Sequence, residues 1–149
     1  MVLDFSACAK TSFGYLVEEL DFSLVDDSWH GESASWVVSY LSSTRSVELV
    51  WGLKDTQFYF SVRRVLENGQ VEAYSEQGIG MFYIFELPLH LEPDRYAVED
   101  FDIGSAPSRE QLEEKVKLNA EVLRTHGWEI LQGNLWYDSN AGVMVGGRV

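Results

Sequence analysis

Residues 33–62 read SASWVVSYLSSTRSVELVWGLKDTQFYFSV, and the predicted sheet rests mainly on this segment. Within it the hydrophobic pattern has a period of two, which places on one strand face the side chains of Trp36, Val38 and Tyr40. Residues 47–53 alternate in the same way, and a third such segment begins at Phe58. Short turn-forming sequences separate the three segments. The pattern predicts successive antiparallel strands with short connections.

Two more segments extend the predicted sheet. Asn68-Gly69 is expected to supply the two positive φ angles of a two-residue hairpin, so that Val71 begins a fourth strand. The run Met81–Phe85 is rich in β-branched and aromatic residues, which favours a strand over a short helix. We therefore expect about four to five strands. Residues 142–149 fit either a short edge strand or a frayed end.

The segment before the sheet is predicted to be helical. From Phe5 to Leu20, apolar residues recur every three to four positions and give one apolar face. Asp4 or Ser6 could cap an early start of this helix, and Ser12 a later one. Gly14 weakens the middle of the longer version by roughly 1 kcal/mol relative to Ala, and the helix should end near Asp21. A short extended piece is then expected at 22–25, followed by a turn at Asp26-Asp27-Ser28.

A second helix is predicted near the other end. Ser108–Gln111 has the form of a capping box, and Gly127 is a natural C-cap. Before it, Pro88 and Pro93 indicate an irregular acidic connector. The chain is thus expected to form a single α+β domain over residues 1–149: an N-terminal helix, an antiparallel sheet, and a C-terminal helix packed on one face of the sheet.

Composition narrows the class of function. The 149 residues are 46% hydrophobic and 13% aromatic, as in a folded domain, and carry a formal net charge of −13. This charge argues against nucleic-acid binding, which needs clustered Lys and Arg. With Cys8 the only cysteine, no intramolecular disulfide can form. No secretory signal or apolar run of membrane-spanning length is found, so we expect a cytoplasmic protein without membrane contact.

The sequence predicts neither a cofactor nor a metal site. Its three histidines, His30, His90 and His126, do not have metal-ligand spacing. It also lacks a phosphate-binding glycine loop and a nucleophile elbow. No catalytic residue is therefore assigned, and the protein is not expected to be an enzyme.

The acidic residues are concentrated in two segments. Residues 11–44 contain six carboxylates and no Lys or Arg, and Glu86–Asp102 contains six carboxylates against Arg95 alone. Such segments attract cationic surfaces. Aromatic anchors with a charged rim are typical of protein interfaces. The candidate partner-binding residues are Asp26, Asp27, Trp29, Glu32, Asp94, Tyr96, Glu99, Asp100 and Asp102.

Besides Trp29 and Tyr96, the aromatic pair Trp136-Tyr137 before Asp138 is also expected in a loop. The simpler interpretation of all these features is that the charge keeps the protein soluble and the aromatic rings fill the core. The two interpretations differ in one respect. If the two acidic segments meet on one face, they form a docking surface; on opposite sides, their charge serves solubility.

The order of elements resembles that of bacterial immunity proteins of polymorphic-toxin and contact-dependent inhibition systems. The resemblance rests on Leu16–Phe22 near the start, and on Ala120–Arg124 with Ile130–Gly133 near the end. It implies a stoichiometric inhibitor that blocks the active site or a basic surface of a cognate toxin. No functional residue is transferred by it.

Three hypotheses follow from the sequence. The first is a non-catalytic acidic protein that binds a basic partner, such as a toxin domain, as a monomer or homodimer. The second is a small-molecule binding module whose pocket, between the sheet and the C-terminal helix, is lined by Trp36, Trp51, Phe58 and Phe60; the same rings could simply form the core. The third, an enzyme, would need two carboxylates that converge in a cleft.

Overall fold

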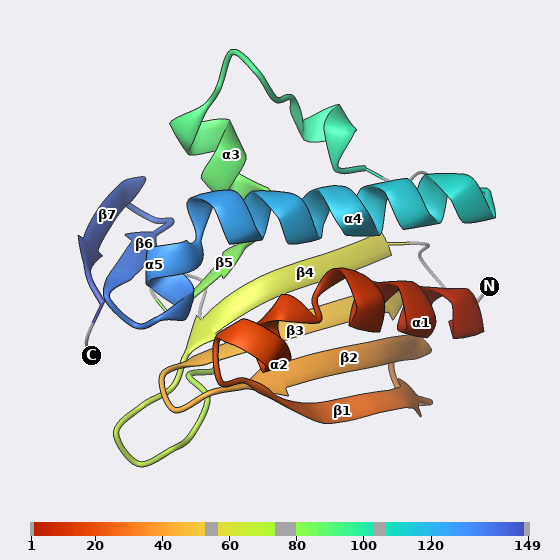
Figure 1. The fold of residues 1–149 in the computed structure, drawn as a ribbon, viewed down its shortest axis with the longest axis horizontal. Helices are drawn as coiled ribbons and strands as arrows, with labels where there is room; N and C mark the ends of the chain where they lie inside the picture. Colours follow the sequence, from red (N-terminus) through yellow and green to blue (C-terminus); the bar gives the residue numbers. More distant parts are fainter. Residues whose placement is uncertain (1, 53–56, 74–79, 103–106, 148–149) are drawn as a thin grey trace.

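A five-stranded antiparallel sheet forms one layer of the molecule (Figure 1). The computed structural model describes residues 2–52, 57–73, 80–102 and 107–147. The strands follow one another across the sheet in chain order: β1 (Ser23–His30), β2 (Ser35–Leu41), β3 (Arg45–Gly52), β4 (Gln57–Arg64) and β5 (Met81–Tyr83). The predicted sheet of four to five antiparallel strands is confirmed.

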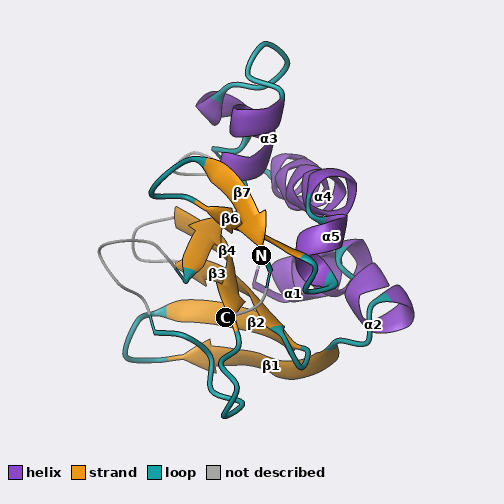
Figure 2. Cartoon of the chain, turned by 90° about the vertical axis from the view of Figure 1, so that its left-hand side faces the viewer, coloured by secondary structure: helices purple, strands orange, loops and turns teal. Residues whose placement is uncertain are grey.

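The helices lie together on one face of this sheet (Figure 2). They are α1 (Val2–Ser12), α2 (Tyr15–Glu19), α4 (Arg109–His126) and α5 (Trp128–Leu131). The short helix α3 (Glu86–Leu91) contacts both α4 and the edge strand β5. A 3-10 turn, η1 (Val98–Asp100), follows α3, and a two-stranded sheet of β6 (Leu135–Asp138) and β7 (Val143–Gly146) ends the described chain. The α+β class and the packed C-terminal helix are confirmed.

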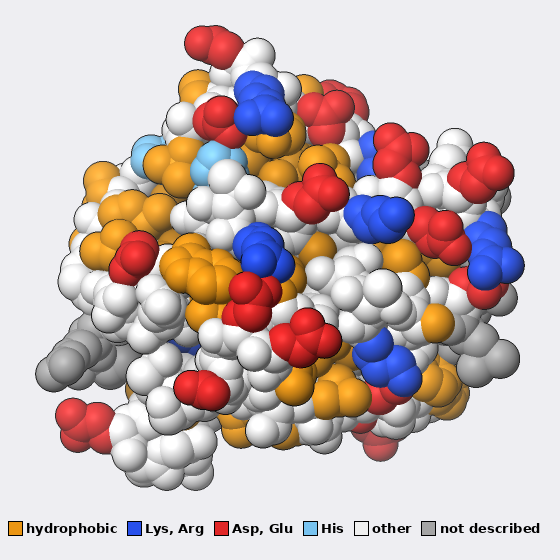
Figure 3. Space-filling model, in the orientation of Figure 1, with side chains coloured by type: hydrophobic (Ala, Val, Ile, Leu, Met, Phe, Trp, Pro, Cys, Tyr) orange, Lys and Arg blue, Asp and Glu red, His pale blue; other side chains and the backbone are white. Residues whose placement is uncertain are grey.

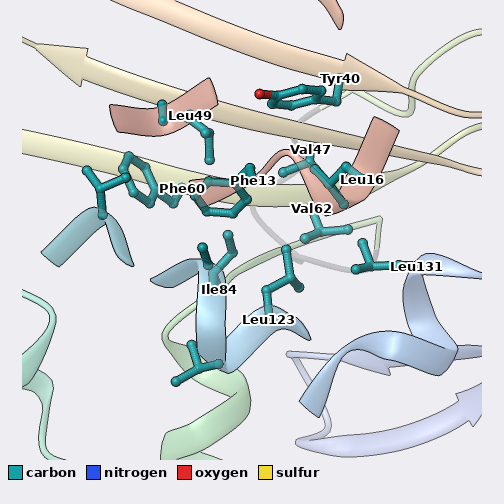
Figure 4. Packing of buried hydrophobic residues seen from close by; sticks show 14 of the residues in the cluster. Phe13, Leu16, Tyr40, Val47, Leu49, Phe60, Val62, Ile84, Leu123 and Leu131 are labelled. Atoms are coloured by element: carbon teal, nitrogen blue, oxygen red, sulfur yellow. The ribbon is translucent and has the colours of Figure 1, made fainter. Parts of the chain in front are cut away.

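The core lies between the sheet and the helices (Figure 4). The alternation predicted from the sequence sends Val38, Leu49 and Val62 toward the helices, and each of these side chains is fully buried. Phe13 and Leu123 enter the same space from the helical layer. Burial of apolar surface at roughly 25 cal/mol per Å² makes this layer contact the main source of stability.

The N-terminal helix is divided in two, which differs from the single helix expected. α1 ends at Ser12 and α2 begins at Tyr15, with Phe13 and Gly14 between them. Gly14 keeps right-handed helical angles (φ −57°, ψ −27°), but its amide donates to the carbonyl of Thr11, three residues back, so the regular α-helical hydrogen bonding is interrupted there. The break keeps the predicted apolar face, because Phe5, Phe13 and Leu16 are all fully buried.

The prediction of a turn at Asp26-Asp27-Ser28 is wrong, because these residues lie inside strand β1. They pair with Ser39, Val38 and Val37 of β2, after a bulge between Leu24 and Asp26. Asp and Ser favour turns because their side chains bond to nearby backbone. Here the carboxylates bind side chains instead, which leaves the backbone free to pair. The chain turns later, at residues 31–34.

The Asn68-Gly69 turn exists but has a different geometry from the one expected. Gly69 has a φ of 83°, whereas the non-glycine residues with positive φ in the described chain are Asp21 and Ala34. The amide of Gly69 donates to the carbonyl of Leu66, and Leu66 pairs with Gln70, so the loop has three residues. After it, Val71 forms an isolated bridge with Val65 rather than a strand.

The connector and the tail are more regular than expected. Pro88 lies in the first turn of α3, where its missing N–H costs no helical hydrogen bond. Residues 142–149 were compatible with an edge strand or a frayed end, and residues 143–146 form strand β7. Trp136 and Tyr137 are not loop residues, because they lie in β6 and are buried.

The capping box at Ser108 and the C-cap Gly127 of α4 are confirmed.

Arg45 holds the C-terminal segment against the sheet. Its side chain is only 1% exposed. The guanidinium donates to the carbonyl oxygens of Thr44, Ile130, Leu135 and Gly147 at 2.8–2.9 Å. It also lies over the Trp136 ring. Burial, with the neighbouring charge of Arg64, lowers the pKa of Arg45 to about 10.

Candidate functional site

The two acidic segments lie at opposite margins of the molecule (Figure 1). β1, which carries Asp26, Asp27 and Trp29, is the outermost strand at one side of the sheet. The connector of residues 92–102 lies beyond α3 and α4 at the other side, next to the end of the sheet formed by β5. The nine candidate residues therefore do not form one surface. Placement on opposite sides favours a solubilising role for the combined charge, so a docking surface can rest only on one of the two segments.

Asp27 is tied to both α1 and β2. It pairs with Val38 on the face that points toward the helices. Its Oδ1 accepts hydrogen bonds from Ser6 and Trp36, both at 2.7 Å, and Lys10 Nζ lies 2.9 Å from Oδ2. Burial opposes ionisation, but these three contacts outweigh it and lower the pKa of Asp27. This carboxylate is structural as well as charged.

Asp26 lies on the opposite face of β1. It accepts a 2.5 Å hydrogen bond from Ser28 Oγ, and the Nε2 of His30 lies 2.8 Å from its Oδ2. The Ser28 hydroxyl and then His30 lower the pKa of Asp26. His30 is the last residue of strand β1. Asp26 keeps free lone pairs, since a carboxylate can accept about four hydrogen bonds.

Trp29 gives this edge an exposed aromatic surface. The side chain is 46% exposed and pairs with Trp36 across the strands. Val25, in the bulge, is 56% exposed. Glu32 is exposed in the turn that follows β1. β1 thus combines a large apolar ring, carboxylates on both faces and a backbone held in a sheet.

In the connector, the Tyr96 ring and the Asp100 carboxylate both contact other groups of the same segment. The Tyr96 ring is half-buried, lies 5.9 Å from the Phe101 ring, and is covered by the guanidinium of Arg95 at 5.2 Å. Asp100 Oδ2 accepts a 2.8 Å hydrogen bond from the Ala97 amide, which caps η1. Asp94, Glu99 and Asp102 are exposed, but none of them lies on a strand or an α-helix.

The helical face carries both signs of charge (Figure 3). Lys and Arg side chains are interleaved there with Asp and Glu side chains. Some of them join the helices, as in the ion pairs Arg109–Asp4 at 3.7 Å and Arg124–Glu19 at 2.9 Å. A face of this composition does not select a cationic partner, so β1 remains the better candidate.

The aromatic side chains proposed for a pocket pack against one another. The Trp51 and Phe58 rings stack at 5.6 Å, and the Phe5 ring of α1 lies within 5.7 Å of both. Phe60 and Trp36 also belong to this packing. Side chains fill the space in which the ligand would lie, which favours the interpretation of these rings as core.

A hollow of about 590 Å³ lies beside Arg45, between residues 42–45, 65–69 and 132–134. The Arg45 guanidinium is directed to four carbonyl oxygens of the chain itself. Its role is therefore to join segments, and the hollow is not assigned as a site. Sequence reasoning missed this arginine, because a basic residue next to a turn gives no sign of burial.

Within ranges 2–52, 57–73, 80–102 and 107–147, no cluster of three His, Cys, Asp or Glu side chains could hold a metal ion. No helix in the same ranges is long and apolar enough to cross a membrane. Cys8 is half-buried beside Ser12 and α4, and burial raises the pKa of its thiol.

Comparison with known proteins gives no relative: no protein-family model matches the chain, and neither the curated proteins nor the solved structures contain a match.

Proposed function

We propose that this protein is a non-catalytic binding protein that docks onto a basic surface of a protein partner through β1 and the turn after it. The observation that carries the proposal is the placement of exposed Trp29 on an edge strand between carboxylates. Aromatic anchors supply much of the energy of protein interfaces, and opposite charge accelerates encounter and excludes wrong partners.

Backbone order favours β1 over the connector. A surface already held in its binding geometry loses less entropy on association. The β1 backbone is paired with β2 except at the bulge residue Val25, and Asp27 fixes it to α1. On the connector, by contrast, the Tyr96 ring is engaged with Phe101 and Arg95.

The specific form of this proposal is a stoichiometric inhibitor of the immunity-protein type. Its support is the resemblance found in the sequence, together with an acidic surface that would suit the basic cleft of a toxin. Blocking such a cleft needs no catalytic residue, which agrees with the absence of a catalytic motif in the sequence.

The test compares two double charge reversals. The partner is first captured from the native host, and its association with each variant is followed by stopped-flow fluorescence at several salt concentrations. One variant is Asp26→Lys with Glu32→Lys, which spares the structural Asp27. The other is Asp94→Lys with Glu99→Lys, which changes the net charge by the same amount.

We expect the β1 variant to slow association about tenfold at low salt, and the connector variant to slow it less than about twofold. The rate of the unmodified protein should fall steeply as salt is added. If neither variant alters the rate, the acidic-surface proposal is wrong. If the connector variant has the larger effect, binding uses the opposite margin of the molecule.

A further inference from the structure

We propose that the outer edge of β1 accepts an extended basic segment of the partner as a sixth strand of the sheet. This inference rests on the proposed function and specifies how the contact is made. Among the described residues, β1 pairs with β2 alone and receives no backbone hydrogen bond on its other side. Alternate N–H and C=O groups along it therefore remain available to another strand.

The second half of β1 is suited to such pairing. The bulge between Leu24 and Asp26 interrupts the ladder, but from Asp26 to His30 each residue has a partner in unbroken register, Ser39 to Ser35. This uninterrupted five-residue stretch is long enough for a ladder with a peptide. Strand addition of this kind gives affinity through the main chain and specificity through alternate side chains.

The alternation of side chains defines the chemistry of the partner segment. Asp26 lies on the outer face of the sheet and Asp27 on the face toward the helices. A strand laid beside them presents successive side chains to opposite faces. Two successive Lys or Arg residues would therefore place one cation near each carboxylate, and one of them could lie over the Trp29 ring.

Charge repulsion also disfavours a second copy of this chain as the strand that pairs with β1. Two β1 edges paired with each other would bring Asp26 and Asp27 of both copies together. Like charges opposite each other destabilise a strand pair. β7, an edge strand of the smaller sheet, carries no charged side chain between Val143 and Gly146 and serves as an internal comparison.

The experiment uses the full chain and a blocked heptapeptide, acetyl-Thr-Val-Lys-Lys-Val-Thr-Val-amide, as the probe. Binding is measured by NMR titration, with amide hydrogen exchange followed at β1 and β7. At 1 mM peptide we expect exchange at residues 26–30 to slow at least fivefold, with no change at β7. A peptide methylated at alternate backbone nitrogens should bind at least tenfold more weakly, because it cannot complete the ladder.

Two variants test the side chains. Trp29→Ala should weaken peptide binding about fivefold, whereas Tyr59→Ala, which alters an exposed aromatic residue of β4, should not. The same peptide with Glu-Glu in place of Lys-Lys should show no protection of β1. Failure of the Lys peptide to slow exchange at β1 would overturn strand addition.

The remaining outcomes separate this inference from the proposed function. Equal binding of the methylated and unmethylated peptides would mean that only side chains bind, so strand addition fails while charge-guided docking stands. Concentration-dependent self-association with protection of β1 would assign the edge to a second copy and contradict the inference. If the captured partner is also insensitive to the β1 charge reversal, the proposed function fails with it.

Discussion

The two acidic segments are nearly equal in charge and differ in how the fold uses that charge. In β1, Asp27 links a strand to α1 and to the neighbouring strand, and Trp29 stays exposed beside it. In the connector, Asp100 caps its own short turn and Tyr96 packs against its own neighbours. The connector is also tied to α4, through the pair between Glu92 and His126 at 2.8 Å. The first segment is therefore part of the sheet, whereas the second is a connector that packs on α4 and has no strand or α-helix of its own.

The difference shows that the number of charges in a segment does not determine its role. A carboxylate that joins distant elements stabilises the fold, whereas an exposed carboxylate contributes little to stability. The contrast can be measured by removing charged groups in turn, from a fully buried one to a solvent-exposed one.

Removal of the buried Arg45 side chain is expected to cause the largest loss of stability among these variants. Arg45→Met removes the donors for four carbonyl oxygens on separate parts of the chain. The Thr44 and Ile130 oxygens keep a backbone donor in the variant, the amides of Val65 and Gly133. We expect the free energy of unfolding to fall by about 3–5 kcal/mol, because a buried acceptor left unsatisfied costs about 1–3 kcal/mol and the segments that Arg45 joins lose their link. Urea unfolding measures the change. Arg95→Met, at an exposed arginine of the connector, is the control and should change it by less than about 0.5 kcal/mol.

Asp27→Ala is expected to have the next largest effect. It leaves the Trp36 indole N–H and the Ser6 hydroxyl without their acceptor and Lys10 without its counter-charge. We expect a loss of about 2–3 kcal/mol in the same urea measurement. A loss below about 0.5 kcal/mol would show that Asp27 is an ordinary surface charge and would remove the contrast between the two segments.

The pH dependence of stability should also show that the Asp27 carboxylate stabilises the fold. The pKa of Asp27 is lowered from its ordinary value of 3.8 in the folded protein, so the unfolded chain binds its proton first as pH falls. The stabilisation is therefore present above that value and is lost as the pH drops through the folded-state pKa. Thermal unfolding from pH 6 to pH 2 should show a weaker acid dependence for Asp27→Asn than for the unmodified protein. Equal slopes would contradict this assignment.

Asp100→Ala should have the smallest effect of the series. It removes the cap of a three-residue turn in an exposed position. The expected loss is about 0.5 kcal/mol, at the low end for capping residues. Differential scanning calorimetry of this variant beside Asp27→Ala compares the segments directly, and a larger loss for Asp100→Ala would reverse their order.

Local sequence patterns predicted the elements whose contacts are local. The period of two in residues 35–52 and the capping box at Ser108 were sufficient to predict β2, β3 and the start of α4. Strand β1 was missed because Asp26-Asp27-Ser28 has the composition of a turn. The partners that hold Asp27 in a strand, Ser6 and Lys10, are about twenty residues away in the sequence.

The candidate site could likewise be predicted only in part. The sequence singled out Trp29, Asp26 and Asp27, but it could not show that they lie on an edge strand or that the connector is on the far side. The role of Arg45 was also beyond prediction, because its acceptors are backbone carbonyls that only the tertiary fold brings together. Such contacts leave no pattern in the sequence.

The most direct test is a hydrogen-exchange map of the whole chain, free and bound to the partner captured from its native host. If β1 is the docking strand, exchange slows at residues 23–32 on binding and is unchanged at residues 92–102. Slowing confined to residues 92–102, with β1 unchanged, would contradict the assignment of the binding surface to β1.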